Sequence, residues 1–283
     1  MRKKERTKKK KPIVLFMQAL LWVYAFISVY PLFWMVSYSL KNNQEIFVSN
    51  PFGPPTSFRI ENYFKAWQEF DVPMYFTNSL LISVATVVVT IAVAVVFSYA
   101  VSRMQWKGRG LAYLYVSMGM FIPVQAILIP VARTVKGMGL MESRWGVIIP
   151  YAAVNLALAC MVYYGFFQSI PREIEEAACI DGANIFQCFL RVIMPMVKPA
   201  TATLVIYIFL NAWNEFILAN VLITVNNLKT LPLGILFFQG QFTTDWGAMG
   251  ATMTIASLPT VLLYVVFSEQ VEGAMTVGGA VKG

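Results

Sequence analysis

The sequence predicts an all-α, polytopic membrane protein with six transmembrane helices. Apolar residues make up 58% of the 283 residues and charged residues only 13%, about half the charged share of a typical soluble domain. Six apolar runs are long enough to cross the hydrocarbon layer, which takes about 20 residues in a helix. Lipid offers the backbone no hydrogen-bond partners, so each run is expected to be helical. The runs are residues 13–39, 75–102, 111–132, 146–168, 200–224 and 250–268.

The first apolar run follows a strongly basic tail at residues 1–12. The tail carries eight Lys and Arg side chains in the sequence MRKKERTKKKKP. A secretory signal peptide also begins with basic residues, but its apolar region is shorter and ends at a small-residue cleavage site, which this run lacks. We therefore expect a retained first span, a tail that anchors its orientation beside the lipid bilayer, and no nucleic-acid partner.

Basic residues also orient the remaining spans. With the N-terminus in the cytoplasm, the cytoplasmic segments hold fifteen Lys and Arg residues and the external loops hold seven. Because short cytoplasmic loops carry the excess of basic residues, this orientation is the predicted one. It makes residues 13–268 a six-span membrane domain and residues 269–283 a cytoplasmic C-terminal tail. Residues 170–195 then lie on the cytoplasmic side.

Several chemical functions lack their residues in this sequence. There is no His, which excludes His-based acid–base catalysis, Ser-His-Asp triads and His metal sites. Cys160, Cys179 and Cys188 have neither metal-type spacing nor a disulfide framework, and we expect them to be reduced. No phosphate-binding G-x-x-x-x-G-K-[ST] motif occurs, so ATP chemistry would belong to another chain. The sequence therefore predicts no enzyme, and no catalytic residue, metal site or cofactor in this chain.

An acidic, alanine-rich element interrupts the apolar runs at about residues 170–195. The carboxylates of Glu173, Glu175 and Glu176 lie where the positive end of a helix dipole favours them. Gly182, in the sequence DGAN, is expected to adopt the left-handed conformation that ends this helix, and Asn184 to cap the next one. The sequence predicts a helix–turn–helix whose small side chains let a partner approach closely.

Two interpretations of this element stay open on the residues alone. It is either a docking surface for a soluble partner or an interfacial hairpin that only braces the helix bundle. The docking candidates are Glu175, Glu176, Ala177, Ala178, Asp181, Gly182 and Ala183.

Glu215 is the only acid that the sequence places within a span. It belongs to the sequence NAWNEF, in which Asn211 and Glu215 are four residues apart and would share one face of a helix, flanked by Trp213 and Asn214. A polar group in the membrane is costly and is therefore a functional candidate. Two interpretations remain: these residues line a substrate path, or they bond neighbouring helices and fix a bend.

The last external loop, residues 237–247, has the sequence FFQGQFTTDWG. Its amides, glycines and aromatic rings suit either contact with an extracytoplasmic protein or plain capping of the adjacent spans. The candidates for such a contact are Gln239, Gln241, Asp245 and Trp246.

Several short sequences together resemble a known family. EAACIDGA, followed by VIMP, resembles the EAA motif of ABC importer permeases, which usually ends in Ile-x-Leu-Pro; Val192 and Met194 are apolar replacements of similar volume. FRIENYFKAW, NSLLIS, SYAVSRMQWKGRG, NAWNEF and the terminal GGAVKG are similar, in this order, to the maltose-type sugar-uptake permeases. The resemblance covers nearly the whole chain.

This resemblance implies a fold, a function and partners. The fold is the six-helix core of the type I ABC importer permease. The function is that of one half of the translocation path for a sugar or oligosaccharide, with a second permease subunit completing a heterodimer. Two cytoplasmic ATPase subunits, which bind ATP and Mg, would dock on the EAA element.

The resemblance also implies a location and a source of substrate. An extracytoplasmic sugar-binding protein would deliver the substrate near residues 237–247, at the bacterial cytoplasmic membrane. The C-terminal MTVGGAVKG is either a disordered end or part of the ATPase interface.

The alternative is a secondary transporter or channel that works without ATP. Proteins of that class usually place several ionisable groups near the middle of the membrane, often at broken helices. A single glutamate, Glu215, offers that class little support.

Overall fold

The computed structural model describes residues 10–238 and 244–280, and within these ranges the chain is all-α, as predicted, with no strand. Short π-helical segments lie at Glu45–Ser49 and Cys188–Ile193, and 3-10 segments at Gly119–Phe121, Asn226–Leu228 and Ile235–Phe238. The α-helices are α2 (Lys10–Ser39), α3 (Glu61–Gln68), α4 (Val72–Arg103), α5 (Arg109–Met118), α6 (Val124–Gly137), α7 (Arg144–Ser169), α8 (Arg172–Ile180), α9 (Ile185–Gln187), α10 (Met194–Met196), α11 (Lys198–Asn214), α12 (Ile217–Leu222), α13 (Leu231–Gly234) and α14 (Trp246–Ala280).

Apolar helices long enough to cross a membrane account for most of the predicted spans. Four single helices qualify: Val14–Ser39, Val72–Arg103, Arg144–Ser169 and Trp246–Phe267. Two bent pairs, Arg109–Phe121 with Val124–Gly137 and Ile185–Met196 with Lys198–Asn214, also qualify, and their halves meet at 111° and 71°. If each bent pair crosses the membrane as one span, the described residues contain six spans, the number that the sequence predicts. The predicted continuous helices over residues 111–132 and 200–224 are wrong.

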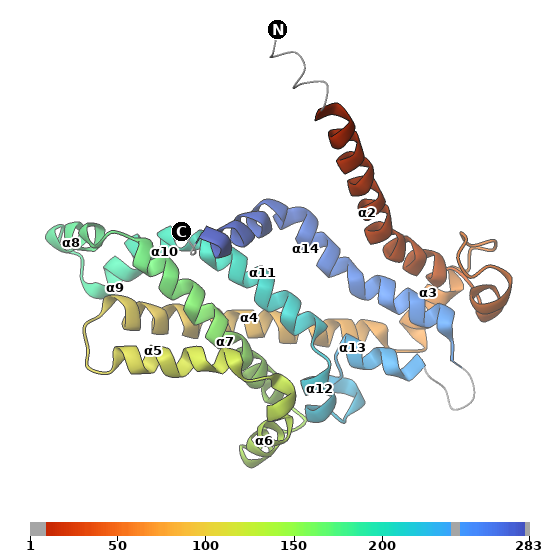
Figure 1. Cartoon of the computed structure of the whole chain (residues 1–283). Coiled ribbons are helices and arrows are strands. Elements are labelled where there is room, and N and C mark those ends of the chain that lie inside the picture. The colour runs from red at the N-terminus through yellow and green to blue at the C-terminus, as the bar shows by residue number, and fades with distance from the viewer. Residues whose placement is uncertain (1–9, 239–243, 281–283) are drawn as a thin grey trace, which may run out of the picture. The chain divides into compact units, whose positions relative to one another are not determined.

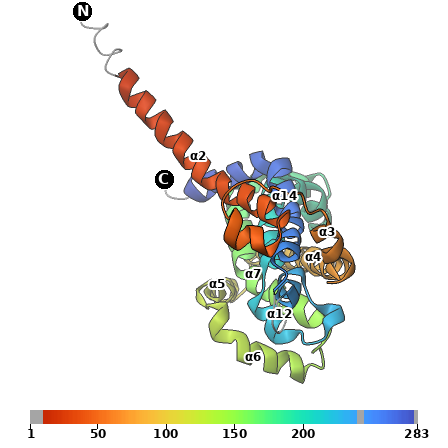
Figure 2. The ribbon, with the colours of Figure 1, turned by 90° about the vertical axis from the view of Figure 1, so that its right-hand side faces the viewer.

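The third predicted helix breaks at Pro123. Ile122, the residue before it, is extended (φ −89°, ψ 113°), because a proline ring disfavours the helical conformation of the preceding residue. α5 and a 3-10 turn lead into this break, and α6 leaves it in a new direction, as Figure 2 shows. The proline therefore ends one helix and begins another instead of kinking a single one.

The fifth predicted helix ends at Asn214. Glu215 is extended (φ −70°, ψ 128°), and the six-residue α12 begins at Ile217. The sequence has no proline or glycine at this point, so neither signal for a helix end predicted the break.

The two ends of the chain bear on the predicted tails. α14 contains a non-helical residue, Phe267 (φ −116°, ψ 22°), and then continues as a helix to Ala280. The predicted C-terminal tail, residues 269–283, is thus helical in its described part. Residues 281–283, and residues 1–9 of the predicted basic tail, lie outside the described residues.

The chain forms two compact units, one of Met1–Asp71 with Ile235–Ser257 and one of Val72–Gly234 with Leu258–Gly283. In the second unit, α4 packs along α7 and against α11 (Figure 1). Ala94, Ala159 and Ala200 are fully buried in its core, and such small side chains let helix backbones approach closely. The Ser98 hydroxyl donates to the carbonyl oxygen of Cys160 at 3.1 Å, which joins α4 to α7. This packing fixes the ends of α4 and α7, beside which α8 begins.

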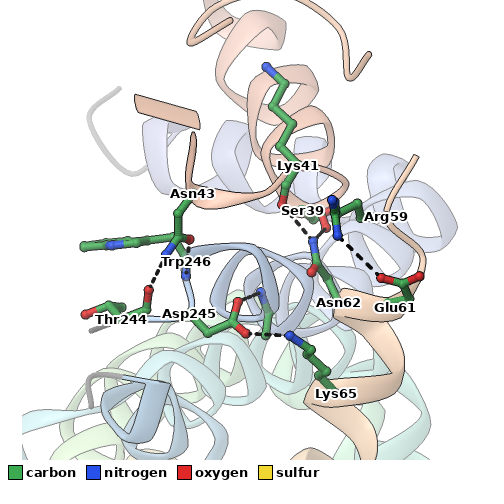
Figure 3. A network of polar contacts seen from close by, with 11 residues as sticks. Ser39, Lys41, Asn43, Arg59, Glu61, Asn62, Lys65, Thr244, Asp245 and Trp246 are labelled. Carbon is green, nitrogen blue, oxygen red and sulfur yellow. Dashed lines mark hydrogen bonds and ion pairs between the residues drawn. The ribbon is translucent and has the colours of Figure 1, made fainter. Parts of the chain in front are cut away.

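The first unit has a polar core where α2 ends (Figure 3). Asn62 of α3 is buried and donates at 2.9 Å to the carbonyl oxygens of Ser39 and Lys41. Lys41 is only 1% exposed, and its ammonium donates at 2.7 Å to the carbonyl oxygens of Asn50 and Gly53. A buried lysine needs such acceptors, because an unpaired buried charge is strongly destabilising. These bonds hold the segment between α2 and α3 against the end of α2.

Candidate functional site

α8 ends, and the next helix begins, as the sequence predicts. Gly182 has φ +84°, so it occupies the predicted left-handed conformation. Asn184 accepts from the backbone N–H of Gln187 at 2.9 Å, and the Gln187 side chain accepts from the N–H of Asn184 at 2.9 Å. This reciprocal capping box starts α9. The predicted helix–turn–helix is confirmed, although its second part is a three-residue α-helix that continues as a π-helical segment.

α8 carries an exposed surface that is both acidic and apolar. Ile180 is 85% exposed and Phe186, just after the turn, is 74% exposed. Large apolar side chains exposed together, beside carboxylates, are typical of a surface that meets a partner. We call this surface the α8 tip; its residues are Glu176, Ala177, Ile180, Asp181, Gly182 and Phe186, all of them exposed.

The other docking candidates lie behind the α8 tip. Ala178 is buried in the core of the second unit, and Ala183 is partly buried against that core. Ile174, on the same side of α8, also packs against this core. The apolar residues of α8 therefore fall into two groups. Ile174 and Ala178 pack against the core and hold the helix in place, whereas Ile180, in the α8 tip, is exposed.

Glu175 differs from its neighbour Glu176 because it forms an ion pair within the chain. Its carboxylate lies 3.4 Å from the guanidinium of Arg103, with 20% and 5% of the two side chains exposed. Arg103, the last residue of α4, also donates to the carbonyl oxygens of Phe167 and Ile170 at the end of α7. This single arginine therefore ties α8 to two long helices. Arg103 is one of the fifteen basic residues that the predicted orientation places in the cytoplasm, and nothing in the sequence indicated the pairing.

The break between α11 and α12 holds three of the four residues considered for a substrate path. A cavity of about 730 Å³ is lined by Tyr207, Leu210, Asn211, Asn214, Glu215, Phe216 and Ile217. Asn211 and Asn214 are exposed, and each amide donates to the carbonyl oxygen four residues earlier. Trp213 does not line this cavity; it is 2% exposed and its ring stacks on Phe209 at 5.7 Å.

Glu215 makes three hydrogen bonds within the chain. It accepts from the hydroxyl of Tyr151, a buried residue of α7, at 2.6 Å. It also accepts from the backbone N–H groups of Leu218 and Ala219, at 2.8 and 3.1 Å, in the first turn of α12. The expectation that Asn211 and Glu215 share one face of a continuous helix is wrong, because Glu215 is extended and its carboxylate caps the next helix. This geometry favours the interpretation of Glu215 as a helix brace.

Two residues of the predicted external loop have contacts within the first unit. Asp245 lies 3.3 Å from the ammonium of Lys65 and accepts from the N–H of Ala248 at 3.1 Å, which starts α14 (Figure 3). The N–H of Trp246 donates to the side chain of Asn43 at 3.2 Å. Gln239 and Gln241, the other two candidates, lie outside the described residues.

None of the described residues forms a group of three or more Cys, Asp or Glu side chains placed to hold a metal ion. The chemical groups gathered at the two sites are therefore amides, carboxylates and apolar side chains. Such groups can bind and position other molecules.

Apolar helices long enough to cross a membrane, a polar break after one of them and an exposed helical hairpin suit a membrane permease. Residues 87–276 match the family described as binding-protein-dependent transport system inner membrane component. The chain belongs to this family, and the resemblance to ABC importer permeases read from its motifs is confirmed.

The relatives of the chain cover nearly all of it. It is 33% identical, over 93% of its length, to the probable ABC transporter permease protein YurM of Bacillus subtilis, of which it covers 88%. It is 32% identical, over 92% of its length, to the diacetylchitobiose uptake system permease protein NgcG of Streptomyces coelicolor, of which it covers 86%. Identity to the trehalose/maltose transport system permease protein MalG of Thermococcus litoralis is 29%, over 96% of this chain and 98% of that protein.

A solved structure shares the fold. It is a bacterial ABC transporter involved in the import of the acidic polysaccharide alginate, one chain of which matches with a TM-score of 0.81. The two chains are 22% identical, and the match covers 92% of this chain and 97% of the other. The predicted type I ABC importer permease fold is confirmed.

Proposed function

We propose that this chain forms one half of the translocation path of an ATP-driven importer for a sugar or oligosaccharide, and that the α8 tip docks a cytoplasmic ATPase subunit. The observation that carries the proposal is the contrast between Glu175 and Glu176. One carboxylate fixes α8 to the membrane helices through Arg103, whereas the other is exposed beside Ile180. A rigidly held helix with an exposed acidic and apolar end suits insertion into a groove of a soluble partner.

The ATPase subunit supplies the energy for transport. Two such subunits, one for each permease half, bind ATP and Mg, since this chain has no phosphate-binding motif. When ATP draws the two subunits together, each pulls on an α8 tip, and the Arg103–Glu175 ion pair passes that movement to α4 and α7. ATP and sugar are then two ligands coupled through one assembly with two conformations.

The cavity at the α11–α12 break is the part of the path that we assign to substrate. Amides and aromatic rings are the groups that bind sugars, and Asn211, Asn214 and Tyr207 line this cavity. Two relatives, whose names refer to diacetylchitobiose and to trehalose and maltose, support a sugar as the substrate. Glu215 shapes the cavity by holding α12, and Trp213 supports it from the buried side.

The remaining partners follow from exposed surfaces and from the family. α2 is apolar, and its side chains are exposed along the first unit, so lipid and a second, different permease subunit cover it. With both termini in the cytoplasm, the segment that contains Gln239, Gln241, Asp245 and Trp246 faces outward. It meets an extracytoplasmic sugar-binding protein, while residues 269–283 reach the ATPase interface. The membrane is the bacterial cytoplasmic membrane.

The experiment is purification of the full chain, with an affinity tag, from membranes of cells grown on sugars. We expect an ATPase subunit, a second permease subunit and, after mild cross-linking, a binding protein that carries its sugar. Mass spectrometry identifies the proteins, and the sugar is identified after its release from the binding protein. A chain that purifies alone and transports a sugar without ATP would contradict the proposal and would indicate a secondary transporter.

A further inference from the structure

A second cavity lies apart from the α11–α12 break. It has a volume of about 300 Å³ and is formed within the second unit by the end of α4, the start of α5, the end of α7 and the first residue of α8. The side chains that matter in it are Ser102, Arg109, Tyr113, Tyr164, Gln168 and Arg172. The rings of Tyr113 and Tyr164 stack at 4.1 Å and form one wall of the cavity.

The lining of this cavity is positively charged. It contains the guanidinium groups of Arg109 and Arg172 and no carboxylate. Arg109 donates to the carbonyl oxygen of Met104 at 3.0 Å, which engages one of its several N–H groups. Arg172 is exposed and has neither a hydrogen bond nor an ion pair among the described residues. Nearby Arg103, in contrast, is already paired with Glu175, so neither Arg109 nor Arg172 has a carboxylate partner among the residues that line the cavity.

Ser102 adds a second observation that points to a ligand. This residue is only 2% exposed, and its hydroxyl has no hydrogen-bond partner in the part of the chain that the structure describes. A buried hydroxyl without a partner is destabilising, and of the four such hydroxyls among the described residues (Ser83, Thr86, Ser102 and Thr230) only that of Ser102 belongs to a residue lining this cavity. Gly110, which also lines the cavity, has open space where a side chain would extend. An acceptor that enters the cavity would meet a hydroxyl and two guanidinium groups.

We infer that this cavity binds a phosphate oxyanion, and that the oxyanion belongs to the head group of an anionic phospholipid. Arginine suits phosphate because its planar N–H groups bind two oxygens at once. The cavity lies where the membrane-spanning helices Val72–Arg103 and Arg144–Ser169 both end, which is the level of the lipid head groups. Basic pockets between spans on the cytoplasmic side are known binding places for anionic lipids. Because Arg172 is the first residue of α8, a bound lipid contacts the helix next to the α8 tip.

The test measures lipid binding by the purified complex that contains the full chain. After delipidation in detergent, native mass spectrometry follows separate titrations with phosphatidylglycerol, phosphatidylcholine and inorganic phosphate. We expect phosphatidylglycerol to bind, and the variant Arg109→Gln/Arg172→Gln to bind it at least about tenfold more weakly, since each charge-assisted pair lost corresponds to about that factor. Ser102→Ala should weaken binding less. Lys198→Gln, which removes an exposed charge outside the cavity, should bind as the wild type does.

The single variant Arg172→Gln separates loss of binding from loss of folding. Arg172 has no partner within the described chain, whereas Arg109 donates to Met104, so the single substitution removes no bond within the chain. This variant should assemble normally and still lose most of the binding. Equal phosphatidylglycerol binding by Arg172→Gln, by the double variant and by the wild type would overturn the inference. So would equal binding of phosphatidylcholine. If inorganic phosphate binds with the same dependence on arginine and the lipid does not, the lipid assignment is wrong and the ligand is a soluble phosphate.

Discussion

At the scale of single residues, Glu215 explains how a membrane helix can end without proline or glycine. The backbone N–H groups that begin a new helix have no partner within that helix, and each is costly if it is buried and left unpaired. The Glu215 carboxylate accepts from two of these groups and from the Tyr151 hydroxyl. One side chain therefore satisfies the start of α12 and attaches it to α7.

The Glu215 brace predicts matched losses of stability. Glu215→Gln keeps one acceptor but brings an amide N–H toward other donors, and Tyr151→Phe removes the donor on α7. We expect each variant to destabilise the assembled complex by about 1–2 kcal/mol, and the double variant to lose less than the sum. Thermal unfolding in detergent measures these losses, and uptake per assembled complex should stay near the wild-type value.

Asn214→Ala is the comparison for the substrate path. Its side chain lines the same cavity and bonds only to its own helix, so we expect normal assembly and reduced uptake per complex. Wild-type stability in both Glu215→Gln and Tyr151→Phe would contradict the brace. If Glu215→Gln lowers uptake per complex and leaves stability unchanged, Glu215 lines the substrate path and is not a helix brace.

Gly182 gives a second prediction at the residue scale. Its φ of +84° is unfavourable for any residue with a Cβ, although a Cβ built there meets nothing within 4 Å. The cost of substitution is therefore conformational, about 1–2 kcal/mol for Ala and more for Val, whose branched side chain adds strain. Asn, which tolerates the left-handed region, should cost less than Ala. Equal uptake and equal assembly for the Ala, Val and Asn variants would show that this turn does not limit the docking of α8.

At the scale of elements, the Arg103–Glu175 ion pair decides whether α8 is a rigid extension of α4 and α7. Removing one partner of a shielded pair is destabilising because the other charge remains, and Arg103 would keep only its two carbonyl acceptors. We expect Glu175→Ala to destabilise the attachment of α8 by about 1–3 kcal/mol. Hydrogen exchange of the α8 amides should then be faster by a matching factor.

Glu176→Ala is the matched control for this measurement. The side chain of Glu176 is exposed and has no partner among the described residues, so its loss should change exchange in α8 by little. If Glu175→Ala and Glu176→Ala leave α8 equally protected, the ion pair does not hold the element.

The same element shows how far local chemistry carries a prediction. Gly182 and Asn184 act through their own backbone and that of close neighbours, and the sequence predicted the turn and the cap that the structure has. Arg103 and Glu175 are far apart in the chain, and their contact depends on how α4 and α7 pack. The break at Glu215 depends likewise on a tyrosine of another helix. Periodicity and composition predict elements, but such tertiary contacts decide where the elements break and which charges stay free.

At the scale of the whole molecule, composition and motif order predicted an all-α importer permease, and the family match over residues 87–276 confirms it. The predicted number of spans depended on long apolar runs, and two of these runs are bent pairs in the structure. The second bend matters for the proposed function, because this pair joins the second half of the hairpin, which begins at Ile185, to α11, which lines the larger cavity. The proposed docking surface and the proposed substrate path are therefore linked through one stretch of chain, residues 185–217.

The central claim is that the α8 tip couples an ATPase to transport, and Glu176→Lys tests it most directly. A charge reversal on an exposed residue should cost little folding energy but disrupt a close, charge-selective interface. The measurement is sugar-stimulated ATP hydrolysis and uptake, each per assembled permease, in vesicles that contain the complete complex. The control is Glu69→Lys, an equal charge change at an exposed position at the end of α3. We expect the control to match the wild type. Glu176→Lys should lose most of the stimulated hydrolysis and uptake, or should release the ATPase subunit. Wild-type hydrolysis and uptake in Glu176→Lys would contradict the claim.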